Sequence, residues 1–252
     1  QPHFFCIYTE TTFFYRLSKH DALPLVSVCS IRSSPVQVGA LTNWSQVACG
    51  YGHTAAIKTD GTLWSWGNNG NGQLGLSDMT DRSSPVQVGN RINWVNAIAG
   101  NGLTFAVDSN GSTWNCGSNA QGKLGLNNAN SKYVLTKYNS TRFNDWARVI
   151  CGSNSNILAL RSNGTVYVSG NTGISSADGY PQLSYEFIPI ELINEPISIL
   201  PNKITYTCYT QSVTGKLYSW GSTSNFSSLG KGNFNYTPTK INAEYPNSRD
   251  WS

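Results

Sequence analysis

Few residues in the sequence have the types and spacing that chemistry requires. Histidine is a common general base and metal ligand, and the 252 residues contain three, at His3, His20 and His53. None of them has a cysteine or carboxylate partner at a spacing typical of a zinc site. We therefore expect His53 to make a structural hydrogen bond beside a turn, and we predict no metal site and no cofactor.

Carboxylates and glycine motifs also argue against catalysis. The thirteen Asp and Glu residues are scattered and nominate no pair for glycoside hydrolysis. Asp60 is accounted for by a predicted turn. The stretch Gly122-Lys123-Leu124 lacks the spacing and the Ser or Thr of a phosphate-binding loop, and there is no Gly-x-Ser-x-Gly elbow. We predict no catalytic residues, and hence no enzyme.

Composition limits the classes of partner. Only 12% of the residues are charged and the net charge is +4 without a basic cluster, so no nucleic-acid partner is expected. No stretch has the roughly 18 apolar residues needed to span a bilayer, and the N-terminal residues lack the pattern of a signal peptide. Because position 1 is Gln, the chain is either processed or a piece of a longer one. We expect a soluble protein.

The six cysteines show neither zinc-site nor Cys-x-x-Cys spacing. Cys49 and Cys151 share one phase of the repeat described next, two periods apart. If each repeat forms its own sheet, equivalent strands of non-adjacent repeats are too far apart for a disulfide, which needs Cα atoms within about 7 Å. We therefore expect buried free thiols.

The main signal is a repeat of about fifty residues. The hexapeptide Ser-Ser-Pro-Val-Gln-Val at 33–38 recurs unchanged at 83–88. Most units open on a tryptophan, with Ile197 near the missing one: Trp44, Trp94, Trp146 and Trp251. Turn glycines follow at spacings of 50, 53 and 51 residues: Gly61, Gly111, Gly164 and Gly215. Self-similarity at a fixed period indicates a repeat architecture.

Each unit is expected to form four short antiparallel strands. Alternating and then continuous apolar residues, a turn dipeptide and an edge proline place the strands of the clearest unit at 44–50, 53–59, 62–67 and 84–88. Asp60-Gly61 joins the second strand to the third, because such dipeptides tolerate the positive φ angles of a tight hairpin turn. Four-stranded units of this kind stack around an axis as the blades of a β-propeller.

Sixteen positions form the expected structural signature of the repeat. They are fourteen glycines, one histidine and one tryptophan: Gly50, His53, Gly61, Trp66, Gly67, Gly75, Gly100, Gly111, Gly117, Gly125, Gly152, Gly164, Gly170, Gly215, Gly221 and Gly230. The tryptophans expected on third strands are Trp64, Trp66, Trp114 and Trp220. We expect most of them to serve in packing and a smaller share to be exposed for stacking on sugars.

The segments 47–57 and 59–76 resemble the regulator of chromosome condensation repeat, in its bacterial and bacteriophage variety. The residues that match its signature are Val47, Ala48, Cys49, Gly50, His53, Thr54 and Ile57. The resemblance covers roughly 33–252 and is strongest in two units. Leu103 and Asn156 stand where His53 would, and 171–195 lack the Leu-Gly loop. The resemblance implies a propeller, usually with seven blades.

This chain has about five such units, which we expect to form one β-propeller domain over 1–252. The approximate units are 1–43, 44–93, 94–145, 146–196 and 197–252. The first aligns with the second without gaps but has no glycine before Gly39. Two arrangements stay open: a five-bladed ring closed by the strand around Trp251, or part of a larger propeller.

For function, we expect a non-catalytic structural or adhesive module that binds other proteins in a multi-subunit assembly. The resemblance favours a bacteriophage or virion surface or tail component, in a virion or extracellular location. One alternative, implied by the family, is a guanine-nucleotide exchange factor that docks on chromatin. Another is a secreted propeller that binds or cleaves a glycan.

Overall fold

The structure is a computed structural model that describes residues 37–38, 40–138, 145–151, 156–175, 181–190, 197–200, 207–212, 214–221 and 235–240. Within these ranges the regular elements are β-strands, apart from the short 3-10 helix η1 (Ala120–Gly122). The same residues include no helix with the length and hydrophobicity to cross a membrane. The all-β prediction is confirmed. Most of the expected first unit, 1–43, lies outside the described residues.

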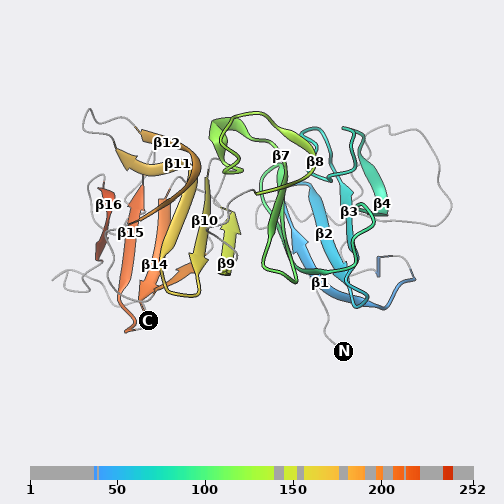
Figure 1. The fold of residues 1–252 in the computed structure, drawn as a ribbon, viewed down its shortest axis with the longest axis horizontal. Coiled ribbons are helices and arrows are strands. Elements are labelled where there is room, and N and C mark those ends of the chain that lie inside the picture. The colour runs from blue at the N-terminus through green and yellow to red at the C-terminus, as the bar shows by residue number, and fades with distance from the viewer. Residues whose placement is uncertain are drawn as a thin grey trace, which may run out of the picture. The chain divides into compact units, whose positions relative to one another are not determined.

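The described strands form four antiparallel sheets of four strands each (Figure 1). The first two sheets contain β1 (Trp44–Cys49), β2 (His53–Lys58), β3 (Leu63–Gly67), β4 (Arg82–Gln87), β5 (Trp94–Ala99), β6 (Leu103–Asp108), β7 (Thr113–Gly117) and β8 (Lys132–Lys137). The other two contain β9 (Trp146–Cys151), β10 (Asn156–Arg161), β11 (Val166–Ser175), β12 (Pro181–Pro189), β13 (Ile197–Leu200), β14 (Thr207–Ser212), β15 (Leu217–Gly221) and β16 (Asn235–Lys240).

Within every sheet the strands lie side by side in chain order, so the fourth strand is at an edge. In the first sheet that edge strand, β4, contains Pro85, as the sequence predicted. Proline lacks a backbone N–H and is tolerated where no further strand needs one. The predicted four-stranded blade is therefore confirmed, in four copies among the described residues.

The chain packs as two compact units. Unit 1 comprises Gln1–Ser118 and Ser131–Lys137 and holds the first two sheets, whereas unit 2 comprises Asn119–Asn130 and Tyr138–Ser252 and holds the other two. The expectation of one domain over 1–252 stays a prediction.

Each hydrophobic core lies between two sheets rather than within one. In unit 1, Ala55 and Ile57 of the first sheet are packed with Trp94, Ala97 and Ala106 of the second. The core of unit 2 likewise joins its two sheets, from Ile150, Leu158, Leu160, Val166, Val168 and Ile190 to Ile199. A single blade cannot bury both faces, and stacking of neighbours supplies the missing contact.

The predicted hairpin turns use glycine for the left-handed conformation. Gly61 has a φ of 77°, and its backbone N–H donates to the carbonyl of Lys58 at 2.9 Å. The equivalent glycines have φ angles of 76°, 85° and 82° at Gly111, Gly164 and Gly215. The preceding residues Asp60, Asn110 and Asn163 keep a negative φ. Only the second residue of each dipeptide therefore needs the freedom that glycine provides.

The third sheet adapts to the absence of a Leu-Gly loop. Its third and fourth strands, β11 and β12, lengthen to 10 and 9 residues. They pair from Tyr167 with Pro189 out to Ser175 with Pro181. The departure from the repeat pattern in this part of the chain changes the loop into a longer hairpin and preserves the four-stranded sheet.

The cysteine prediction is only partly correct. Cys116 is a buried free thiol, and Cys151 is free but only partly buried. Cys49 is disulfide-bonded, so the expectation of a free thiol there is wrong. The argument from repeat phase compared only equivalent positions in separate blades, and it could not exclude a pairing of Cys49 with a cysteine at another phase.

Candidate functional site

The residues with catalytic potential serve the fold instead. Among the described residues, no three His, Cys, Asp or Glu side chains gather closely enough to hold a metal ion. His3 and His20 lie outside those residues. The Asp60 carboxylate is used by its own turn, where hydrogen bonds from the Thr62 hydroxyl and backbone hold its pKa below the ordinary value.

His53 joins two neighbouring sheets. Its side chain is buried, and Nε2 lies 2.9 Å from Oγ1 of Thr104 on β6. The Thr104 hydroxyl donates its only proton to the carbonyl of Gln73 at 2.7 Å, so Nε2 of His53 must be the donor in the first contact. Nδ1 is then unprotonated, and it has no hydrogen-bond partner among the described residues. Burial lowers the pKa of His53 from 6.5 to about 4, which keeps the ring neutral.

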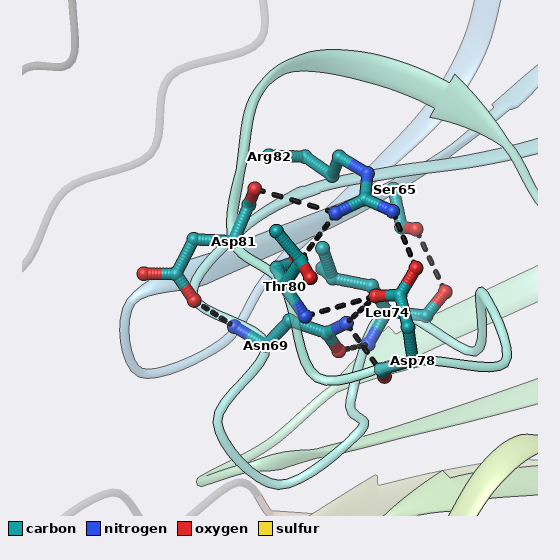
Figure 2. A network of polar contacts seen from close by, with 7 residues as sticks. All are labelled: Ser65, Asn69, Leu74, Asp78, Thr80, Asp81 and Arg82. Carbon is teal, nitrogen blue, oxygen red and sulfur yellow. Dashed lines mark hydrogen bonds and ion pairs between the residues drawn. The ribbon is translucent and has the colours of Figure 1, made fainter. Parts of the chain in front are cut away.

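A buried asparagine organises the loop between β3 and β4 (Figure 2). Oδ1 of Asn69 accepts the backbone N–H of Leu74 at 3.0 Å, and its amide donates to the carbonyl and carboxylate of Asp78 at 2.9 and 3.0 Å. Arg82 closes the loop with an ion pair to Asp78 at 2.6 Å. One repeat later, Asn119 makes the same central contact, with Oδ1 accepting the Leu124 N–H at 2.8 Å. Every residue drawn in Figure 2 takes part in at least one contact within the loop or its flanks.

The same loop is attached to the sheet that follows it. Ser77, at a φ of 68°, donates its N–H to the carbonyl of Tyr133 on β8 at 2.9 Å. Gly72 backs onto Tyr133, where a Cβ would lie 2.9 Å from the tyrosine Cα. We call these contacts the loop clip. The corresponding contact in unit 2 joins Asn127 to Tyr185 at 2.8 Å.

Sequence reasoning missed the loop clip, although a signal for it exists. Tyr133 and Tyr236 are the second residues of β8 and β16, and Tyr185 lies within β12 at a spacing from each that is close to the repeat. The signal is weak because the first sheet has Ser83 at the matching position.

Aromatic pairs occupy the other end of the third strands, near the hairpin turns. Trp44 and Trp64 meet edge-on with ring centroids 6.1 Å apart, and Trp94 and Trp114 do so at 5.9 Å. Trp146 and Tyr167 form the corresponding pair at 5.6 Å in the third sheet. The opening tryptophan of each of these units is thus held by the third strand, and these aromatic residues do serve in packing.

Cations cover one face of two of these rings. Nζ of the buried Lys58 lies 3.6 Å from the Trp64 ring centroid. Arg91 and Lys137 are both exposed. Cζ of Arg91 lies 4.1 Å from the Trp114 ring centroid, and Nζ of Lys137 lies 6.0 Å from it. Within the described ranges neither Arg91 nor Lys137 forms an ion pair. Unit 1 therefore presents two uncompensated positive charges beside Trp114.

A cleft of about 320 Å³ opens next to these charges, between the edge strands of the two sheets of unit 1. Its apolar lining residues are Leu76, Val88, Trp94, Trp114, Val134 and Leu135, and its polar ones include Ser77, Gln87, Asn90 and Arg91. We call this the Trp114 cleft. The repeat pattern did not predict this cleft, because Arg91 occupies the position of Leu41 one repeat earlier and so lacks a repeat signal.

The signature positions lie at turns, strand ends and close contacts. Trp66 packs on Trp44 at 5.9 Å, and a Cβ at Gly50 would collide with the His53 ring. The second glycine of each unit ends the third strand or lies within it, at Gly67, Gly117, Gly170 and Gly221. Gly75, Gly100 and Gly125 lie in connections between strands. Gly152 and Gly230 lie outside the described residues.

Comparison with known proteins gives a consistent result. Two models of the Regulator of chromosome condensation (RCC1) repeat match residues 44–73 and 60–107. A stretch of 36 residues is 53% identical to the ultraviolet-B receptor UVR8 of Arabidopsis thaliana, and it covers 14% of this chain and 8% of that protein.

Solved structures support the fold. Human WBSCR16 is similar with a TM-score of 0.72 and 18% identity, over 90% of this chain and 59% of its own. Prp20p of Saccharomyces cerevisiae, reported with its binding properties to Gsp1p and histones, has a TM-score of 0.62 and 22% identity over 78% of this chain and 50% of its own. This chain thus spans only 59% of the first of these structures and 50% of the second. Residues 44–107 match the regulator of chromosome condensation (RCC1) repeat, and the four-stranded sheets are similar to the blades of these β-propeller structures.

Proposed function

We propose that this chain is a non-catalytic propeller module that binds other proteins. The observation that carries the proposal is the exposed pair Arg91 and Lys137, which have no ion-pair partner among the described residues. Arg91 lines the Trp114 cleft, and Lys137 approaches the Trp114 ring that forms part of its lining. Uncompensated charge next to apolar surface is a common feature of interaction sites. In contrast, His53 and Asp60 are used by the fold and offer no reactive group.

The finer proposal places the module in a multi-subunit assembly, as a structural or adhesive part of a virion surface or tail or in an extracellular setting. It is supported by the low share of charged residues, 12%. Exposed apolar side chains near the cleft add to this support, since Ile92 and Val95 expose 69% and 58% of their surface.

A guanine-nucleotide exchange and chromatin-docking function is the second candidate. Its support is the structural likeness to Prp20p, which is described with its binding to Gsp1p and histones. A glycan function has less support, because stacking on a sugar needs an open aromatic face. Lys58 covers one face of Trp64, and Arg91 covers one face of Trp114.

The test is purification of the protein from its natural source at low salt, followed by cross-linking mass spectrometry. We expect a complex of constant stoichiometry, with cross-links from the lysines of unit 1. Recovery of the chain alone and monodisperse would contradict the interaction proposal. Release of labelled GDP from a small GTPase, or hydrolysis of any member of a glycan panel, would overturn its non-catalytic part.

A further inference from the structure

We infer that the Trp114 cleft binds an acidic peptide segment of a partner protein. A carboxylate of the peptide contacts Arg91 and Lys137, and a neighbouring aliphatic side chain enters the cleft. The inference rests on the proposed function, since it names the chemistry of the partner at one site of the module.

The shape and lining of the cleft suit a short peptide segment. Its volume of about 320 Å³ is at the lower end of the range for ligand sites, roughly 300–1,000 Å³. The apolar side is built by Val88, Trp94 and Leu135, of which Val88 and Trp94 are buried in the core of unit 1. The lining is therefore held in place before a ligand arrives, which lowers the entropic cost of binding.

The charge of the rim selects an acidic segment. Arg91 and Lys137 are cations next to Trp114, and the Asp108 carboxylate also contacts this residue. Asp108 is only 3% exposed, and its oxygens already accept the indole N–H of Trp114 at 3.1 Å and backbone N–H groups of the turn. Its geometry leaves the two exposed cations to a carboxylate from outside, which would form charge-assisted hydrogen bonds.

A peptide fits these features better than a nucleic acid does. Phosphates would also contact Arg91 and Lys137, but nucleic-acid sites usually carry an extended basic groove. Here the two cations border a small apolar cleft, which matches an aliphatic side chain next to an acidic one. Gln87 and Asn90 on the rim place amide groups where the backbone of the peptide would pass.

The experiment measures fluorescence anisotropy of a fluorescein-labelled peptide, Gly-Asp-Asp-Leu-Leu-Asp-Asp-Gly, against the full chain at low ionic strength. The cleft variant is Arg91→Gln with Lys137→Gln. The matched control is Lys132→Gln with Arg148→Gln, which removes the same charge from residues that neither line the cleft nor approach the Trp114 ring. We expect the cleft variant to bind at least about tenfold more weakly and the control to stay within about twofold. Replacing the leucines of the peptide by serine should also weaken binding.

Three outcomes would overturn the inference. One is an equal loss of affinity in the cleft and control variants, which would assign binding to net charge. Another is undiminished binding of a peptide with Asn in place of Asp. A third is that single-stranded DNA, but not the peptide, binds in a manner that depends on Arg91 and Lys137.

The proposed function can be judged separately. If the natural complex forms with the cleft variant as it does with the wild type, the cleft inference fails and the interaction function stands. If the wild type forms no complex, the proposed function itself fails.

Discussion

Nε2 of His53 lies 2.9 Å from Oγ1 of Thr104, and this contact connects the second strands of two neighbouring sheets. The Thr104 hydroxyl also donates a hydrogen bond to the Gln73 carbonyl, so one hydroxyl connects a strand from each sheet with the loop after β3. The three polar groups are buried, and besides Thr104 the Gln73 carbonyl has only the longer contact from the Cys116 thiol, at 3.5 Å.

Thr104→Val should destabilise unit 1. The change keeps the shape of the side chain but leaves the His53 N–H without an acceptor and the Gln73 carbonyl with only the weak Cys116 thiol as donor, at a cost of roughly 2–4 kcal/mol in unfolding free energy. Thr113→Val is the matched control, because the Thr113 hydroxyl is similarly buried and has no hydrogen-bond partner in the described part of the chain. Urea denaturation of both variants tests this, and equal losses would show that the hydrogen-bond chain contributes nothing.

Stability should fall in mild acid because of His53. Its folded-state pKa, about 4, is below the ordinary 6.5, so the unfolded chain binds more protons between these values. Stability from this group is complete above pH 6.5 and decreases as the pH falls toward 4. We expect a loss of about 2 kcal/mol in unfolding free energy between pH 7 and pH 5. His53→Gln should remove this slope, and a variant that keeps it would assign the slope to other groups.

Asn69→Ala should loosen the loop between β3 and β4. The substitution removes the acceptor for the Leu74 N–H and the donor for Asp78 from a buried position, which costs about 2–4 kcal/mol. Limited proteolysis should then cut within 68–81. Asn90→Ala, an exposed asparagine of the next connection, serves as the control and should change stability by less than about 0.5 kcal/mol. Protection equal to that of the wild type would argue against the central role of Asn69.

Gly72→Ala should cost more than Gly89→Ala. Both glycines have a positive φ, 77° and 64°, so both substitutions carry a backbone strain of about 1–2 kcal/mol. At Gly89 an added Cβ meets nothing within 4 Å, whereas at Gly72 it would collide with Tyr133. The difference between the two melting curves therefore measures the loop clip. Similar melting temperatures would show that Tyr133 moves aside without cost.

The strands and turns of the blades could be predicted because their signals are local. Asp60-Gly61 and the apolar run that begins at His53 act over a few residues, and the repeat multiplies the evidence. The four-stranded sheets follow from those signals and from the need to bury both faces of a blade. The extended hairpin of β11 and β12 could not be predicted, since only the loss of a loop signal marks it.

The candidate site was beyond sequence reasoning for a different reason. Arg91 and Lys137 approach the same tryptophan only after two sheets have stacked. Arg91 does not recur one repeat earlier, where Leu41 stands, and the Lys240 that matches Lys137 two repeats later does not by itself indicate a cleft. The contact of Ser77 with Tyr133 was missed because it joins backbone atoms far apart in the chain. Cys49 shows the same limit, because a disulfide depends on distances in space that repeat phase alone does not give.

The loop clip has a direction along the chain, because Ser77 contributes the donor and a strand of the following sheet contributes the acceptor. Every blade that has both parts therefore donates to the following blade through its loop and accepts from the preceding blade through its fourth strand. A blade duplicated in tandem would supply an acceptor strand for the loop of the blade before it and a donor loop for the strand of the blade after it. The number of blades in such a chain can therefore change by duplication without any new kind of contact between neighbouring blades.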